Sequence, residues 1–99
     1  MPMTAATPER VERFAGESCL QLGDRFLELR CVMNARQRYI QGVPTRVSGF
    51  DGKFENLPFF DARKAIVERK SLSLTLENGE RFRVAIIDTE GSFTAAPVD

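Results

Sequence analysis

The stretch Ser71–Asp88, SLSLTLENGERFRVAIID, carries the strongest fold signal in the chain. Apolar side chains alternate with polar ones on both sides of Asn78-Gly79, and this period of two is typical of strands with one buried face. An Asn-Gly pair between two such runs predicts a β-hairpin. A fold built on antiparallel strands is therefore expected.

Hydrophobic register decides the length of this turn. A two-residue loop would place Leu74 opposite Arg83 and so bury an arginine beside a leucine. A three-residue loop, Glu77–Gly79, instead pairs Leu74 with Phe82 and sets Gly79 in the left-handed position of a bulge. We therefore predict the three-residue loop, in which Leu72 faces Val84. The exposed face then carries four polar residues: Ser73, Thr75, Arg81 and Arg83.

The size and charge of the chain indicate one small domain. Its 99 residues, 42% of them hydrophobic, suit a single β-rich domain over 1–99, with loose ends at 1–6 and 96–99. Fourteen basic and fourteen acidic residues give no net charge, which removes the simplest argument for nonspecific nucleic-acid binding. No apolar run is long enough for a membrane span, and we expect no membrane partner. No secretory signal is recognised, so a cytoplasmic location is expected.

Histidine is absent, and the chain has only two cysteines. Two thiols alone cannot complete a zinc site, so neither a metal nor another cofactor is expected. In the predicted register Cys19 faces Glu28, whereas Cys31 lies on the side of Leu29. A disulfide between the two cysteines is therefore not expected, and both are predicted to be reduced.

The N-terminal half is predicted to contain a helix and several strands. Thr7-Pro8-Glu9 is typical of a helix start, and the helix is expected over 8–15, packed on the sheet or used as a partner-binding arm. Two strands follow over 18–34, with a two-residue Gly23-Asp24 turn that sets Leu20 opposite Leu27. A turn is expected at 34–37 and a long strand at 38–50, interrupted at Gly42 and Pro44.

The C-terminal half is predicted to begin with a second turn over 50–53. A four-residue loop, Gly49–Gly52, would pair Val47 with Phe54, and a two-residue Asp51-Gly52 turn is the alternative. A short strand over 54–57 and a helix over 62–69, capped by Asp61, come next. After the Ser71–Asp88 hairpin, a four-residue turn over 88–91 returns Phe93 to face Ile86.

These elements predict a mainly β fold. We expect a small antiparallel barrel or rolled sheet of about six or seven strands, with an N-terminal helix and one short inserted helix. The order of elements is compatible with an OB-like barrel and equally with other small barrels.

Catalysis is not expected from this sequence. Without histidine, no Ser-His-Asp or Cys-His arrangement can form. Asp51, Asp61 and Asp88 each occupy a predicted turn or cap, which explains them structurally. No glycine-rich phosphate loop is present.

Two kinds of binding remain open. Basic and aromatic residues alternate along the middle of the chain, a mixture that barrels binding single-stranded nucleic acid use for phosphates and bases. The residues concerned are Arg36, Arg38, Tyr39, Arg46 and Phe50. Single-stranded nucleic-acid or nucleotide binding is therefore one hypothesis.

The preferred hypothesis is a noncatalytic protein-interaction or assembly module. It would act through a sheet edge and the arginine-bearing face of Ser73, Thr75, Arg81 and Arg83, with a protein partner or self-association. The ending ENGERFRVAIIDTEGSF, residues 77–93, is similar to the terminal hairpins of small barrel proteins that join phage heads to tails. That resemblance implies an assembly subunit of phage type as a further alternative.

Overall fold

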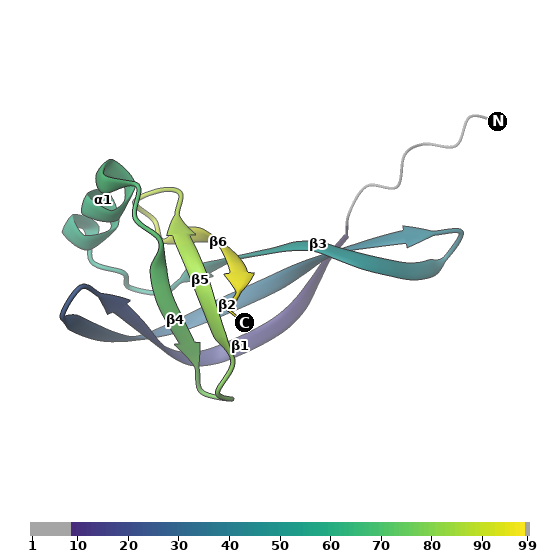
Figure 1. The fold of residues 1–99 in the computed structure, drawn as a ribbon, viewed down its shortest axis with the longest axis horizontal. Coiled ribbons are helices and arrows are strands. Elements are labelled where there is room, and N and C mark those ends of the chain that lie inside the picture. The colour runs from purple at the N-terminus through teal and green to yellow at the C-terminus, as the bar shows by residue number, and fades with distance from the viewer. Residues whose placement is uncertain (1–8, 99) are drawn as a thin grey trace.

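The computed structural model describes residues 9–98, and the side chains of Glu9 and Ser48 are not among the parts described. These residues form six strands and one helix: β1 (Glu9–Leu22), β2 (Arg25–Ile40), β3 (Val43–Phe54), α1 (Phe59–Glu68), β4 (Leu72–Leu76), β5 (Arg81–Ile86) and β6 (Ser92–Pro97). The strands close into an antiparallel barrel in the order β1-β2-β3-β6-β5-β4 (Figure 1). The predicted small antiparallel barrel is confirmed.

The barrel consists of two three-stranded meanders, β1–β3 and β4–β6, connected through α1. Two seams join the meanders: β1 pairs with β4, where Leu20 faces Leu74, and β3 pairs with β6, where Gly52 faces Phe93. A Cβ atom on Gly52 would lie 2.7 Å from the Phe93 ring and 3.1 Å from Met33 Cα. Glycine at this position therefore allows the two meanders to approach each other.

Alternate residues of each strand fill the barrel interior, as strand geometry requires. Leu20, Met33, Leu74 and Phe93 have no exposed surface, and the rings of Phe54 and Phe93 are 4.5 Å apart. Helix α1 adds Ala62 and Ala65 to this core. The core thus draws on both meanders and on the segment between them.

The Ser71–Asp88 hairpin has the predicted register. Leu74 pairs with Phe82 and Leu72 with Val84, and the apolar side chains of these pairs are buried. The Leu76 N–H donates to the Glu80 carbonyl at 2.8 Å, so Glu77–Gly79 is a three-residue loop. Gly79 has φ +90°, the left-handed conformation expected for the bulge.

Two other predicted turns are also confirmed. Gly23-Asp24 links β1 to β2 with Gly23 at φ +61°, and Leu20 faces Leu27. At the β5–β6 turn, Asp88 Oδ1 accepts hydrogen bonds from the Glu90 and Ser92 N–H groups at 3.0 and 3.1 Å. That turn brings Phe93 opposite Ile86, as predicted.

The predicted N-terminal helix is wrong from Glu9 onward, because these residues form β1. Thr7 and Pro8 lie outside the described residues. The three-residue spacing of Val11 and Phe14 suggested a helix, but the β1–β2 register shifts between Glu12 and Phe14. A β-bulge there keeps both side chains on the same face of a strand, so the three-residue spacing results from the bulge and not from a helix.

The predicted turns at 34–37 and 50–53 are wrong, because both segments lie within long strands. The chain reverses at Gln41-Gly42 instead, where both residues have positive φ of 53° and 78°. Val47 accordingly pairs with Gln37 and not with Phe54. Gly52 resembled a turn residue, but it serves close packing against β2 and β6.

The inserted helix is confirmed with different ends. Helix α1 begins three residues earlier than predicted, its N-cap is Pro58, and no side chain caps it. Asp61 lies in the first turn and does not cap the helix. The expected strand at 54–57 is not formed, because β3 ends at Phe54. Ala96 and Pro97, expected in a loose end, belong to β6.

Candidate protein-interaction site

A three-stranded arm extends from the barrel on the side opposite α1 (Figure 1). We define the arm as residues 9–16 of β1, 35–40 of β2 and 43–49 of β3. Among the described strands, β4 pairs with β1 only from Ser18 to Gln21, and β6 pairs with β3 only from Phe50 to Lys53. Barrel closure therefore leaves one edge of β1 and one edge of β3 without a neighbouring strand along the arm.

One face of the arm continues the barrel core. Val11 and Phe50 both lie opposite the buried Ala35, and farther out Val47 faces Gln37 and Tyr39 faces Pro44. Phe50 still packs against the core through Phe82, with ring centroids 5.3 Å apart. Beyond this point nothing in the barrel covers the face, so Val11 is 43% exposed and Val47 is 37% exposed.

The opposite face of the arm is rich in arginine. Arg36 and Arg38 point there, because side chains alternate along β2 and Gln37 and Tyr39 occupy the core side. The Nε atoms of Arg36 and Arg10 each lie 3.5 Å from Asp51 Oδ2. A Cβ atom on Gly49 would be 2.9 Å from Arg36 Nη2, so this guanidinium lies against the glycine.

Irregular pairing brings Arg46 close to Arg38. The β2–β3 register shifts twice between Arg36 and Tyr39, which marks bulges in β3. Thr45 Oγ1 donates to the Arg38 carbonyl at 2.8 Å, and the Gln37 side-chain amide donates to the Thr45 carbonyl. Arg38 and Arg46 line one shallow pocket together with Thr45 and Val47. We call Arg38 and Arg46 the arginine tip.

The five residues suggested for nucleic-acid binding therefore do not share one exposed face. Arg36 and Arg38 lie on one side of the arm, Arg46 joins Arg38, and Tyr39 and Phe50 lie on the core side. Stacking platforms and phosphate contacts need to reach the same strand of nucleic acid. This placement gives the nucleic-acid hypothesis no support.

The four residues of the predicted hairpin face do lie together. Ser73 pairs with Arg83 and Thr75 with Arg81, and all four side chains are exposed on the outside of the barrel wall. They are on the wall and not on the arm. Thr75 also borders a second feature, which the sequence did not reveal.

That feature is a groove on the outside of β1, β2 and β4, which we call the acidic groove. Its lining contains three carboxylates and one half-buried thiol. The residues are Glu17, Ser18, Cys19, Glu28, Thr75, Leu76 and Glu77. The β1–β4 seam creates it by placing Cys19 opposite Thr75. Strand register predicted that Glu28 faces Cys19, but no signal in the sequence indicated that Glu77 would join them.

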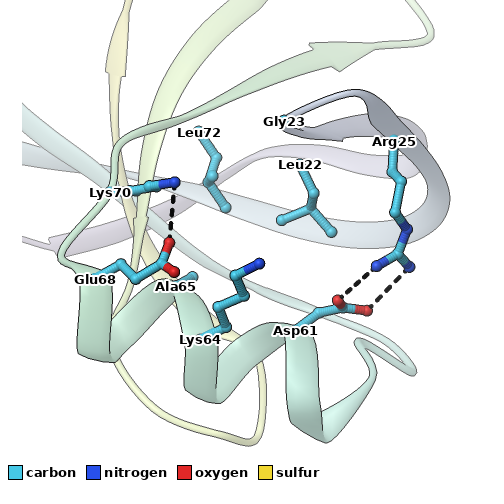
Figure 2. Close-up of a pocket in the computed structure, with 9 residues that line it drawn as sticks. All are labelled: Leu22, Gly23, Arg25, Asp61, Lys64, Ala65, Glu68, Lys70 and Leu72. Carbon is cyan, nitrogen blue, oxygen red and sulfur yellow. Dashed lines mark hydrogen bonds and ion pairs between the residues drawn. The ribbon is translucent and has the colours of Figure 1, made fainter.

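A further pocket lies between α1 and the end of the barrel (Figure 2). Arg25 binds both carboxylate oxygens of Asp61, at 3.0 and 3.4 Å, and Lys70 Nζ is 3.0 Å from Glu68. The hydrogen bond from Lys70 lowers the pKa of Glu68. These ion pairs connect α1 to its surroundings, so the charged groups of this pocket already have a structural role.

Little in the described part of the chain suggests reaction chemistry. Residues 9–98 contain no group of three potential metal ligands placed around one point. Burial raises the pKa of the Cys31 thiol, which makes it a poor nucleophile at neutral pH. None of the described helices has the length and apolar character needed to cross a bilayer.

Comparisons with models of protein families, with curated proteins and with solved structures found no match to this chain.

Proposed function

We propose that the protein is a noncatalytic interaction module of the cytoplasm, which engages another protein chain through its arm. The observation that carries this proposal is the exposed apolar strip formed by Val11 and Val47 on the core-side face of the arm, where one edge of β1 and one edge of β3 have no neighbouring strand of the barrel. The arginine-bearing face of Ser73, Thr75, Arg81 and Arg83 is a second surface of the same proposal, next to the acidic groove.

The physical reason is that the barrel leaves apolar side chains and backbone strand edges of the arm uncovered. The core-side face of the arm continues the hydrophobic interior outward with Val11 and Val47 exposed, and Ile40 and Val43, on the opposite face at the end of the hairpin, are 59% and 61% exposed. A partner that covers the strip removes apolar surface from water, at about 25 cal/mol per Å². A partner strand can also pair with the backbone of β1 or β3 along the arm.

Bulges and proline limit how that pairing can extend. Pro44 cannot donate a backbone hydrogen bond, and the irregular pairing of β3 interrupts the ladder near Ser48. These features oppose unlimited strand addition. They favour a defined interface that combines a short strand edge with the apolar face.

Joining of phage heads to tails is a narrower form of this proposal. Residues 77–93, which carry that resemblance, form the turns on both sides of β5, β5 itself and the beginning of β6. This geometry supports assembly in general and does not favour that particular assembly.

The experiment compares Val47→Lys with Val67→Lys. The first places a charge on the apolar strip, and the second makes the same change at an exposed position of α1, away from both proposed surfaces. Size-exclusion chromatography with light scattering, followed by affinity capture with tagged protein, measures association. We expect Val47→Lys to weaken association about tenfold, because it buries an unpaired ammonium, and Val67→Lys to leave it unchanged.

Circular dichroism must show both variants folded. A wild-type protein that stays monomeric and captures no partner contradicts the proposal. Equal association by the two variants also contradicts it, since the arm would then not be the contact surface.

A further inference from the structure

Charge is distributed unevenly along this neutral chain. Residues 29–50 contain four arginines and no acidic residue. The rest of the chain therefore has ten of the fourteen basic residues against all fourteen acidic ones. Residues 35–40 and 43–49 of this basic segment form the β2–β3 part of the arm, so this part of the arm is net positive while the rest of the chain is net negative.

The arginine tip is the part of the arm whose charge is available. Asp51 holds Arg36 and Arg10, but no ion pair within residues 9–98 engages Arg38 or Arg46. Both side chains are exposed, and they line the same shallow pocket. The tip therefore has two exposed guanidinium groups that a binding partner can contact at the end of the arm.

The acidic groove has the complementary charge. Glu17 lies 3.7 Å from Arg30, and both of these side chains are largely exposed. The carboxylates of Glu28 and Glu77 have no ion-pair partner in the described part of the chain. The groove also offers apolar surface, including the half-buried Cys19 side chain. A guanidinium bound there would contact carboxylates with its donors and apolar groups with its flat face.

We propose that the arginine tip of one copy binds the acidic groove of a second copy, so that the protein associates head to tail. This inference rests on the proposed function and names the partner and the two surfaces. One chain cannot satisfy the contact by itself. Arg30 marks the position of the groove on β2, because it pairs with Glu17 of the groove lining. The end of β2, where the tip lies, is roughly 30 Å farther along the strand.

The two surfaces differ, so the contact is heterologous, and repetition gives a ring or an open filament. Two arginines on a shallow groove bury less surface than a standard protein interface. A single contact is therefore weak, and added salt weakens it further because the charges are near the surface. Burial of the neighbouring apolar strip increases the affinity of the contact, but it does not determine which surface of the second copy is bound.

Cys19 provides a native reporter of the groove. It is half-buried in the groove lining, and the chain's other cysteine, Cys31, has no exposed surface. Modification of the folded protein by a thiol reagent therefore reports on Cys19. We expect its rate to fall about fivefold as the protein concentration is raised to the assembling range, and to recover in high salt.

The decisive experiment is a charge reversal in two separate proteins. Arg38→Glu/Arg46→Glu reverses the tip, and Glu28→Arg/Glu77→Arg reverses the groove. Each variant alone is expected to associate at least about tenfold more weakly than wild type, because like charges then meet. An equimolar mixture is expected to recover association. In the mixture, every tip meets a groove of opposite charge.

Arg63→Glu/Lys64→Glu on the exposed surface of α1 is the matched control, because it changes the net charge as much as the tip reversal does. It is expected to associate like wild type. Light scattering and Cys19 modification are measured on all four proteins and on the mixture, after circular dichroism has shown that each is folded.

The outcomes separate this inference from the proposed function. If wild type assembles but the reversals do not weaken it, or if the mixture stays dissociated, the head-to-tail contact is overturned while the role of the arm stands. If wild type is monomeric and Cys19 reactivity is independent of concentration, self-association is overturned. The comparison of Val47→Lys with Val67→Lys in affinity capture then decides the proposed function by itself.

Discussion

Gly52 lies on β3 where the backbone of β2 and the ring of Phe93 leave no room for a side chain. We expect Gly52→Ala to lower the free energy of unfolding by about 1–3 kcal/mol, the usual cost of overpacking a close contact. Gly49→Ala is the control on the same strand. Its Cβ would meet the mobile end of Arg36, which can move aside, so it should cost less than about 1 kcal/mol.

Urea unfolding followed by circular dichroism measures both variants. If the two variants lose the same free energy of unfolding, Gly52 is not more closely packed than Gly49.

Asp88 makes stability depend on pH at the β5–β6 turn. The backbone N–H groups of Ser92 and Glu90 donate to its carboxylate and lower its pKa. The unfolded chain therefore takes up this proton at a higher pH than the folded chain does, and acidification favours unfolding. The stabilisation is fully present above the ordinary aspartate pKa, about 3.9, and is lost as the pH falls through the lower folded value.

Asp88→Asn keeps an oxygen acceptor for the turn but removes the titration. We expect its unfolding free energy to vary less steeply with pH below about pH 4 than that of wild type. Urea titrations at several pH values give the slope. Identical slopes for the two proteins would show that Asp88 does not contribute to acid sensitivity.

At the scale of elements, the arm is expected to be less stable than the barrel that supports it. It has strand edges without neighbours and exposed apolar side chains, which are typical of segments that open locally. Tyr39 is the chain's only tyrosine, tryptophan is absent, and Tyr39 lies on the arm. Tyrosine fluorescence therefore reports on the arm, whereas far-ultraviolet circular dichroism is dominated by the strands of the barrel.

We expect the fluorescence transition in urea to have a lower midpoint than the dichroism transition, at a protein concentration below the assembling range. Coincident transitions would mean that arm and barrel unfold as one unit.

The sequence predicted elements well where a turn and a hydrophobic alternation agreed. Gly79 and Gly23 follow runs whose apolar residues select a single register, and both turns are confirmed. The predictions failed where a residue suited two roles. Gly52 served packing and not a turn, and the bulge between Glu12 and Phe14 gave a strand the spacing of a helix.

At the scale of the whole molecule, the placement of charge argues against nucleic acid as the partner. The arginines of the arm lie on one face and its aromatic side chains on the other, and the chain has no net charge. We expect short DNA and RNA oligomers to show no salt-dependent change in fluorescence anisotropy at physiological ionic strength. Binding that weakens with salt would revive the nucleic-acid hypothesis.

Barrel closure is also the reason why the candidate site could not be predicted in full. The basic segment is continuous in the sequence, so its arginines could be recognised as candidate binding residues from the sequence alone. The acidic groove combines β1 and β2 with a turn about sixty residues later than β1, through the pairing of Cys19 with Thr75. Local patterns fix hairpins, but they do not specify which strands from distant parts of a chain become neighbours.

The two-meander architecture also has a consequence for how copies can combine. Both seams join residues before α1 to residues after it, and each meander alone leaves a hydrophobic face open. The first meander of one copy can therefore close on the second meander of another copy and form every contact of the barrel. Strand exchange across α1 is a route to an intertwined dimer that needs no new surface. Two fragments divided within α1 have the complementary faces needed to reassemble into the native barrel.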